Sequence, residues 1–311
     1  MGNYGNRPMG QRRGFGARII PALVIAFFAW MMYMNQTEEN PVTGQKQHVA
    51  ISPDQEIRLG LESAPMMAYK MGGEVSSADP HNKAVQGVGA TLISHTIAKK
   101  SPWKFQFHLL ADDETVNAFA LPGGQIFITM GLLNKLQNEA QLAGVLGHEM
   151  GHVIERHTAE QMAKNQLGQA LVIAAGSAAS DQSQAPYMIA GFVNQMLQLR
   201  YSRKDESEAD QWGIQLMMEA GFDPREMIGV MKILKESSGG GHSVEMFQSH
   251  PNPDLRMEQI NTYLQEHPPA THLTKGRSLK QLITHIMQNG QIEGARNFEK
   301  PIDSKSAEIF Y

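Results

Sequence analysis

The chain has 311 residues, which is long enough for one large domain or two modest ones. Its formal net charge of −4 gives no electrostatic reason to expect a nucleic-acid partner. The absence of cysteine excludes disulfide bonds, thiolate catalysis and cysteine-ligated zinc, and it is compatible with an oxidising compartment without establishing one.

The N-terminal region divides into three short segments. Residues 1–18 are rich in glycine, asparagine and arginine and contain no acidic residue, which indicates a basic cytoplasmic arm. Residues 19–35 predict a transmembrane signal anchor, because they include a run of sixteen uncharged and mostly apolar residues. Residues 36–50 are polar and rich in turn-forming residues, so they predict a linker. The arginines of the arm orient the anchor so that the remainder of the chain lies across the membrane.

A cleaved signal peptide is the alternative interpretation of this region. No cleavage site with small residues follows the apolar run, and a chain without cysteine has no site for lipidation there. The uncleaved anchor is therefore the interpretation that the sequence favours.

Two helices and a small sheet are predicted for the segment that follows the linker. Ser52 and Asp79 are N-cap residues followed by proline, so they predict helices over 53–70 and from residue 80 onwards. Strands are predicted from the alternating or continuous apolar residues at 103–109, 116–121 and 125–129, and a short helix at 130–136.

The predicted sheet permits two interpretations. It can be a simple three-stranded meander that packs against the helices. It can also present one strand edge to an extended peptide, which would add to the sheet through backbone hydrogen bonds. The residues of that candidate edge strand are Asn117, Ala118, Phe119 and Ala120. The two interpretations can hold together.

A helix predicted from residue 138 to about residue 166 carries the sequence His148-Glu149-Met-Gly-His152. Residues four apart on a helix share one face and lie about 6 Å apart, so His148 and His152 can bind one Zn²⁺. Glu149 is offset by about 100° and can act beside the metal as a general base. This HExxH arrangement is the signature of zinc peptidases, although the same spacing also arises by chance on ordinary surface helices.

Two glycines within the motif helix support the functional interpretation. Gly147 and Gly151 each weaken a helix by roughly 1 kcal/mol relative to alanine. Their presence is understandable if another backbone or a substrate has to come close to this helix. The neighbouring residues are apolar, and buried histidines need polar partners. A catalytic zinc site is therefore favoured over a chance pattern.

A third protein ligand is expected, because a two-histidine zinc site in a peptidase needs one more and leaves a position for water. Ser202 and Asp205 predict a capping box at the start of a helix. On this helix Glu206 and Asp210 share a face, so Glu206 can bind the metal and Asp210 can hydrogen-bond a ligand histidine. The alternative is an ordinary acidic helix start that complements the helix dipole.

The remaining predicted elements are helical. Residues 170–193 are rich in small residues and predict a hairpin, which either forms buried core or touches a membrane surface. Further helices are predicted from 223 to 238, from 252 to 267 and over 278–289, with a glycine-rich link after the first of them.

Four segments in this order resemble those of the membrane-associated gluzincin metallopeptidases, a family that includes the CAAX prenyl endopeptidases, the HtpX proteases and exported quality-control relatives. The matching segments are 117–124 (NAFALPGG), 148–152 (HEMGH), 200–210 (RYSRKDESEAD) and 249–256 (SHPNPDLR). The chain is most similar to members with a single anchor or none, because one apolar run is present and the C-terminus shows no convincing helical repeat.

The resemblance implies an α+β, mostly helical zincin-type peptidase domain over 51–267, with a small sheet beside the HExxH helix and a tail at 268–311 that holds one helix. It implies one Zn²⁺ per chain. The ligands would be His148, His152 and Glu206, with Glu149 as the general base.

Three residues are candidate hydrogen-bond donors to the oxyanion: Arg203, Tyr201 and His250. His250 can instead fold back as a fourth zinc ligand, which would displace the catalytic water and leave the enzyme latent. A structural role at the following helix is the third possibility for His250. The other histidines near the motif, His157, His95 and His108, are expected to be structural or surface residues.

The expected protein is a membrane-anchored zinc endopeptidase that hydrolyses unfolded or damaged exported proteins in protein quality control. It would be a single-pass protein of the bacterial inner (cytoplasmic) membrane, with its catalytic domain on the periplasmic side and polypeptides as substrates. One alternative is a zinc-binding chaperone or scaffold with little or no proteolysis, which would have no need of Glu149 as a base. The other is a non-peptidase zinc hydrolase, which would have no use for the edge strand.

Overall fold

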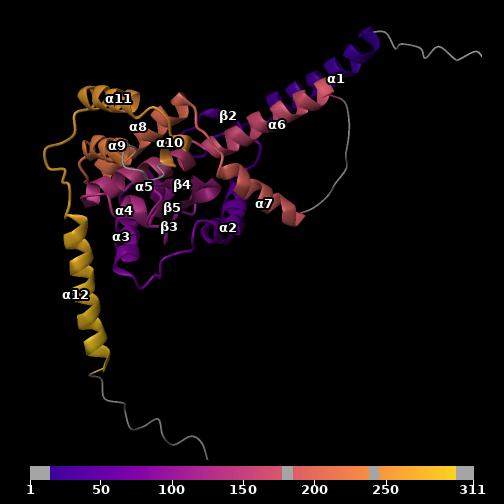
Figure 1. Cartoon of the computed structure of the whole chain (residues 1–311). Helices are drawn as coiled ribbons and strands as arrows, with labels where there is room; N and C mark the ends of the chain where they lie inside the picture. The colour runs from indigo at the N-terminus through magenta and orange to yellow at the C-terminus, as the bar shows by residue number, and fades with distance from the viewer. Residues whose placement is uncertain (1–14, 177–184, 238–244, 299–311) are drawn as a thin grey trace, which may run out of the picture.

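The computed structural model describes residues 15–176, 185–237 and 245–298. Helices surround a small sheet, in which β3 (Gln106–Leu110) and β4 (Ala118–Leu121) flank β5 (Gln125–Thr129) (Figure 1). The fold is mostly helical and of the α+β class, as predicted.

The helices before the sheet begin where the capping residues predict. Ser52 opens α2 (Pro53–Lys70) with a capping box, in which its hydroxyl accepts from the backbone N–H of Gln55. Asp79 opens α3 (Pro80–His95) by accepting from the backbone N–H of His81 at 2.7 Å. A 3₁₀ helix, η1 (Ile97–Lys100), follows α3 and leads into the sheet.

The sheet is mixed rather than a meander. β3 pairs parallel with β5 and β4 pairs antiparallel with β5, so the prediction of a simple meander is wrong. Every residue of β5 is buried, as expected for the strand that lies between the other two. β4 is left at one edge, and the turn η2 (Pro122–Gly124) that connects it to β5 contains two glycines with positive φ.

The motif helix α5 (Glu139–Ile154), which follows the short helix α4 (Met130–Leu133), packs closely on α8 (Arg203–Glu219). A Cβ atom on Gly147 would lie 3.3 Å from the Cα of Gly213, and one on Gly151 would lie 2.9 Å from the Cα of Ala209. The two glycines of α5 thus admit the backbone of α8, which confirms the expectation that another backbone comes close.

The helix predicted from residue 138 to about residue 166 is interrupted, because α6 (His157–Gly176) starts in a new direction after Arg156. Arg156 has a left-handed backbone with φ of 59°, which ends the regular hydrogen bonding of α5. Its buried guanidinium donates to Oε1 of Glu56 at 2.7 Å and to the carbonyl oxygen of Ile51 at 2.8 Å. These contacts hold the interruption in place, and the sequence pattern contains no glycine or proline that would indicate it.

Residues 36–50, expected to be a linker, instead form a docked hairpin. β1 (Thr37–Glu39) pairs antiparallel with β2 (Lys46–His48). The side chains of Asn40 and Gln47 are buried and donate to the carbonyl oxygens of Ile154 and Glu155, at 2.8 Å and 2.6 Å. The hairpin therefore satisfies carbonyl groups at the C-terminal end of α5 that would otherwise lack partners.

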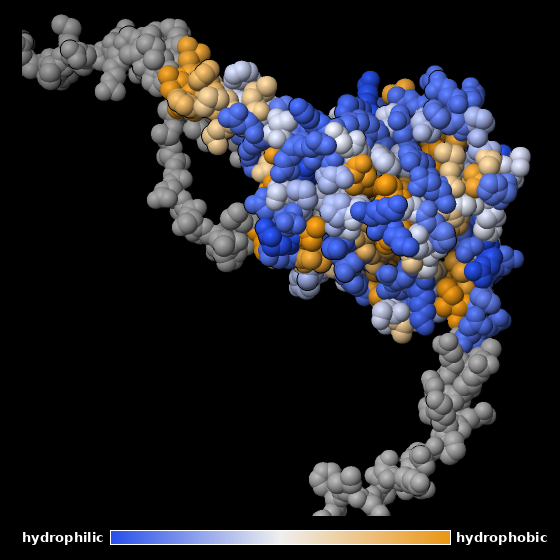
Figure 2. Space-filling view, turned by 180° about the vertical axis from the view of Figure 1, so that it is seen from behind, coloured by the Kyte–Doolittle hydropathy of each residue, from blue (hydrophilic) through white to orange (hydrophobic). Residues whose placement is uncertain are grey.

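α1 (Phe15–Asn35) runs alongside α6 and projects with it from the body of the protein (Figure 1). Apolar residues gather on this projection in Figure 2, and many of the described side chains of α1 are large, apolar and exposed. Within the part of the chain whose side chains are described, which leaves out residues 15–22, no helix is both long and apolar enough to cross a membrane. α7 (Ala185–Met196) returns to pack on α2, and the turn of the hairpin predicted over 170–193 lies outside the described residues.

Four helices in the described C-terminal part of the chain complete the domain. They are α9 (Glu226–Ser237), α10 (Met246–Ser249), α11 (Pro253–Glu266) and α12 (Leu279–Phe298). α9 packs on α5, α11 packs on α8 and α9, and α12 packs on α3. Asn252 precedes α11 with a left-handed backbone and makes no side-chain cap. The segment before α12 contacts the start of α5 through a bridge between Asn138 and Ser278, so the tail is attached to the peptidase domain. The glycine-rich link lies outside the described residues.

Candidate metal centre

Four buried side chains from three elements converge at one point. His148 and His152 come from α5, Glu206 from the first turn of α8, and His250 directly follows α10. One potential ligand atom from each residue lies within 4.8 Å of the others. Nε2 of His152 is 3.1 Å from Nε2 of His148 and 3.6 Å from Oε1 of Glu206. The close packing of α5 on α8 brings these atoms together.

The spacing of the atoms fits a tetrahedral zinc site. Ligand bonds of about 2.0–2.1 Å to a tetrahedral Zn²⁺ place neighbouring ligand atoms roughly 3.3 Å apart. Nε2 of His148 is 3.6 Å from Oε2 of Glu206 and 3.3 Å from Nδ1 of His250. Imidazole and carboxylate groups are also the donors that zinc takes in proteins without cysteine. The residues therefore fit a bound zinc ion in both distance and chemistry.

Glu149 lies beside the cluster without belonging to it. Its carboxylate is fully buried, and neither oxygen has a hydrogen-bond partner among the described residues. Oε1 of Glu149 is 3.7 Å from Nε2 of His250. Burial raises the pKa of Glu149, although the neighbouring His250 and His148 favour its charged form. A carboxylate in this environment accepts a proton readily, which is the property that a general base requires.

Asp210 and Arg256 form a layer behind His148. Nδ1 of His148 lies 2.9 Å from Oδ1 of Asp210, which is the kind of contact that the sequence suggested for Asp210. Arg256, in the first turn of α11, donates to both oxygens of Asp210 at 2.6 Å and 2.8 Å. Burial alone would raise the pKa of Asp210, but the guanidinium of Arg256 outweighs it and holds this pKa well below its usual range.

Arg256 also contacts the candidate carboxylate ligand. Its Nη1 lies 2.9 Å from Oε2 of Glu206. Burial opposes ionisation of Glu206, but the adjacent His250 and Arg256 lower its pKa below the ordinary value. A zinc ligand has to be deprotonated, so this electrostatic environment prepares Glu206 to bind a metal.

Two residues of this centre do not follow from the sequence patterns. Arg256 belongs to the matching segment 249–256, but only the need for a cation beside buried carboxylates could have pointed to its role. His157 is not a surface residue, because its buried Nδ1 lies 2.9 Å from Nδ1 of His152. No sequence signal indicates this contact, since it depends on the interruption at Arg156. His95 is exposed, and His108 hydrogen-bonds within the sheet region, as expected of surface and structural residues.

The candidate oxyanion donors differ in position. Tyr201 stacks its ring on His152 with centroids 3.9 Å apart, and its hydroxyl lies 3.2 Å from Oγ1 of Thr158. Burial raises the pKa of Tyr201, so its phenol stays protonated. Arg203 begins α8 with an exposed side chain and is not brought into the buried cluster. His250 directs Nδ1 toward the candidate ligands and Nε2 toward Glu149, so it lies nearest to the chemistry.

A cavity of about 540 Å³ borders the edge strand β4. Phe119 lines it from β4 and Asn117 from the position before β4. Met67 lines it from α2, Met71 from the C-cap of α2, and Ser249 from the position before His250. Oδ1 of Asn117 is buried and has no hydrogen-bond partner among the described residues. The cavity therefore has a mixed polar and apolar lining, and it combines an unpaired acceptor with the strand that lies at the edge of the described sheet.

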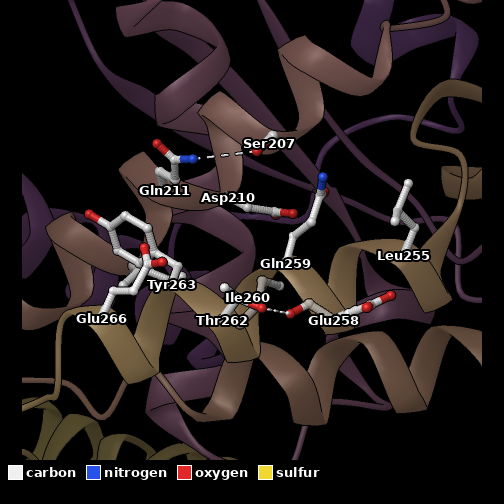
Figure 3. A pocket seen from close by; sticks show the side chains of 11 residues that line it. Ser207, Asp210, Gln211, Leu255, Glu258, Gln259, Ile260, Thr262, Tyr263 and Glu266 are labelled. Atoms are coloured by element: carbon white, nitrogen blue, oxygen red, sulfur yellow. Dashed lines mark hydrogen bonds between the residues drawn. The ribbon is translucent and has the colours of Figure 1, made fainter.

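A second cavity, of about 340 Å³, lies between α8 and α11 (Figure 3). In this view Asp210 points into the space between the two helices, and Ile260 and Tyr263 approach from α11. None of the four candidate ligand residues lines it, and neither does Glu149.

Comparison with known proteins agrees with this geometry. A mitochondrial metalloendopeptidase OMA1 from Schizosaccharomyces pombe is 29% identical over 236 residues, which are 75% of this chain and 68% of the relative. A beta-barrel assembly-enhancing protease from Escherichia coli K12 is 27% identical over 294 residues, covering 86% of this chain and 57% of the relative. A mitochondrial OMA1 metalloendopeptidase from Danio rerio is 31% identical over 255 residues, covering 78% and 53%.

These matches span between about half and two thirds of the relatives' own length. The model of peptidase family M48 matches residues 80–264, which is more than half of the chain and includes every candidate metal ligand. The chain therefore belongs to peptidase family M48, the zinc metallopeptidases.

Proposed function

We propose that this protein is a membrane-anchored zinc endopeptidase that cuts unfolded or damaged exported polypeptides. The observation that carries the proposal is the convergence of His148, His152 and Glu206 at zinc-ligand spacing, with the unpaired carboxylate of Glu149 beside them. In this proposal one zinc ion is held by those three residues, and Glu149 is the general base.

When bound, zinc supplies a Lewis acid that polarises the scissile carbonyl and acidifies the attacking water. The remaining chemistry belongs to the protein. Glu149 takes the proton from the water and passes it to the leaving amine, and its raised pKa suits both transfers. An oxyanion donor is also needed, and His250 is one candidate, because its Nε2 faces Glu149 and has no hydrogen-bond partner among the described residues. Its other candidate role, as a fourth ligand, is tested below.

The edge strand β4 would allow an extended peptide to bind beside the metal centre. A substrate segment that adds to β4 would align its backbone by strand pairing, which is independent of its sequence. The unpaired Oδ1 of Asn117 would accept a substrate N–H, and the apolar part of the cavity, where methionines lie beside Phe119, would take a large apolar side chain. Only an unfolded segment presents both features, so unfolded chains are the substrates that we propose.

The setting in exported-protein quality control rests on the N-terminal region and on the relatives. The name of the Escherichia coli relative refers to the assembly of β-barrels.

The alternative of a zinc-binding chaperone or scaffold is a different proposal. It gives no reason to bury the two oxygens of Glu149 without a partner, since an unpaired buried carboxylate is costly.

We also propose that α1 is the membrane anchor of a single-pass protein in the bacterial inner membrane, with the peptidase on the periplasmic side. Support comes from the arginine-rich arm before it and the exposed large apolar side chains along it. Leu23 and Met32 are both 63% exposed, which is unfavourable in water and favourable in lipid.

Replacement of Glu149 by glutamine tests the proposed activity. Full-length protein in detergent should digest casein, and Glu149→Gln should reduce this cleavage by roughly 10²–10⁴-fold because the base is lost. A chelator should stop cleavage by the unmodified protein. The chaperone alternative predicts instead that the unmodified protein holds zinc and binds casein without cutting it, and that result would reject the peptidase.

Metal analysis tests the ligands separately. The purified protein should hold one zinc per chain, and Glu206→Ala should abolish most of the zinc content. Asp210→Ala should weaken zinc binding by about 10–100-fold, because His148 loses its hydrogen-bond partner. Glu219→Ala, an exposed acid on the same helix, is the matched control and should keep its zinc. Full zinc content in Glu206→Ala would refute the assignment.

The variant His250→Ala separates the two active roles of this residue. The short distances from Nδ1 to Glu206 and His148 favour the fourth ligand, so we expect the variant to retain zinc and to cleave casein or itself faster. An oxyanion donor would instead lose about 2.7–4 kcal/mol of transition-state stabilisation, seen as a lower kcat. Unchanged zinc content together with unchanged cleavage would exclude both roles.

Extraction with alkaline carbonate tests the anchor. The full-length protein should stay with the membranes, and a variant that lacks residues 19–35 should appear in the soluble fraction. A reporter that is active only outside the cytoplasm should be active when fused at the C-terminus. Release of the full-length protein at a mass lower by roughly 3–4 kDa would show a cleaved signal peptide and contradict the proposal.

A further inference from the structure

A buried chain of polar contacts extends from His152 away from the metal centre. Nδ1 of His152 lies 2.9 Å from Nδ1 of His157, and Nε2 of His157 lies 3.3 Å from Oε2 of Glu208. Both imidazoles are 2% exposed, whereas Glu208 reaches the surface and pairs with Lys204 at 2.9 Å. The chain therefore connects a candidate zinc ligand to an ionised surface carboxylate.

The distances determine where the protons lie. Nε2 of His152 faces the other candidate ligands, so a neutral His152 that binds metal through Nε2 carries its proton on Nδ1. That proton is donated to Nδ1 of His157, which has to be unprotonated to accept it. The proton of His157 is then on Nε2, where Glu208 accepts it. In this arrangement every N–H group of the row His152, His157 and Glu208 meets an acceptor. It is the only arrangement of the protons that satisfies all three residues and leaves Nε2 of His152 unprotonated for metal binding.

The interruption between α5 and α6 makes this contact possible. On an uninterrupted helix, a residue five positions later is rotated by about 140° from the first, so His157 would point away from His152. The left-handed backbone of Arg156 turns the chain, and α6 begins at His157 with its ring directed back at His152. The buried ion pair between Arg156 and Glu56 holds this turn.

The neighbouring acidic side chains do not make this group a second metal site. His157, Asp205 and Glu208 have potential ligand atoms within 4.8 Å of one another. However, the carboxylate of Asp205 accepts from the backbone N–H of Ser202 at 2.9 Å in the capping box, and the ammonium group of Lys204 already neutralises Glu208. Nδ1 of His157 is engaged by His152.

We propose that His157 is a positioning residue for the metal ligand His152, and that Glu208 supports it from the surface. This inference rests on the ligand assignment proposed above. His157 fixes the tautomer and the ring orientation of His152, as Asp210 does directly for His148. The two histidine ligands thus both end on a carboxylate, one through a direct contact and the other through a second imidazole.

Zinc affinity measured by competition with a chelator tests the proposal without depending on proteolysis. His157→Ala should weaken zinc binding by about 10–100-fold, as expected for the loss of a partner to a ligand histidine. His157→Asn keeps a short side chain with an acceptor oxygen toward Nδ1 of His152, so it should recover most of the affinity. His95→Ala, at an exposed histidine, is the control and should match the unmodified protein. Glu208→Ala should weaken binding in the same direction but less.

The melting temperature without zinc separates positioning from general stabilisation. His157→Ala should lower the melting temperature of the zinc-loaded protein more than that of the zinc-free protein. An equal loss in both forms, without rescue by His157→Asn, would make His157 a purely structural residue and overturn the proposal. If His157→Ala does not fold, Glu208→Ala carries the test, because its side chain is partly exposed.

Two further outcomes separate the possible failures. Unchanged zinc affinity in His157→Ala and Glu208→Ala, together with zinc loss in Glu206→Ala, would reject this inference and keep the ligand assignment. Two zinc ions per chain that fall to one in His157→Ala would identify a second metal site and reject positioning. Absence of zinc binding by the unmodified protein would reject the ligand assignment itself, and the inference with it.

Discussion

The burial of three carboxylates in one small volume is the constraint on which the centre depends. Glu149, Glu206 and Asp210 are 0%, 1% and 3% exposed, and an uncompensated buried charge costs several kcal/mol. Arg256 brings one positive charge into the same volume. A zinc ion would bring the other two, so that three negative charges meet three positive ones. Arg256 and the metal would therefore together neutralise the buried negative charge. Glu149 is the carboxylate without a fixed partner, so it is the one that is free to exchange protons.

This requirement also explains the tight packing of α5 on α8. The three proposed ligands, His148, His152 and Glu206, come from two helices, so the precision of their geometry depends on the contact between those helices. Gly147 and Gly151 reduce that contact to backbone against backbone, which leaves few side-chain rearrangements that could move Glu206 relative to the histidines. The glycines thus reduce the local stability of the helix, but they fix the distance between the ligands on α5 and α8. Metal binding and the docking of the two helices reinforce each other for the same reason.

Patterns that depend on local sequence were predicted well, and features that depend on tertiary contacts were not. The caps at Ser52 and Ser202, the strand at 125–129 and the i,i+4 histidine pair follow from local rules. The strand order does not, because it depends on which strand is buried from both sides. The left-handed backbone of Arg156 could not be predicted either, since the partners that hold its side chain, such as Glu56 and Ile51, are distant in the sequence. The roles of His157 and Arg256 follow from these long-range contacts.

The docked hairpin at residues 36–50 has a consequence for where the enzyme can work. If its 15 residues were a free and fully extended tether, the domain could move up to about 50 Å from the membrane surface. Instead, Asn40 and Gln47 hydrogen-bond to the C-terminal end of α5, the helix that carries the two histidine ligands. Glu38 also pairs with Arg156. With α1 anchored as proposed, the cutting site keeps a fixed height and tilt above the lipid. The active site of such an enzyme would reach only a thin layer next to the bilayer. A polypeptide would therefore become a substrate by remaining in that layer rather than by its sequence.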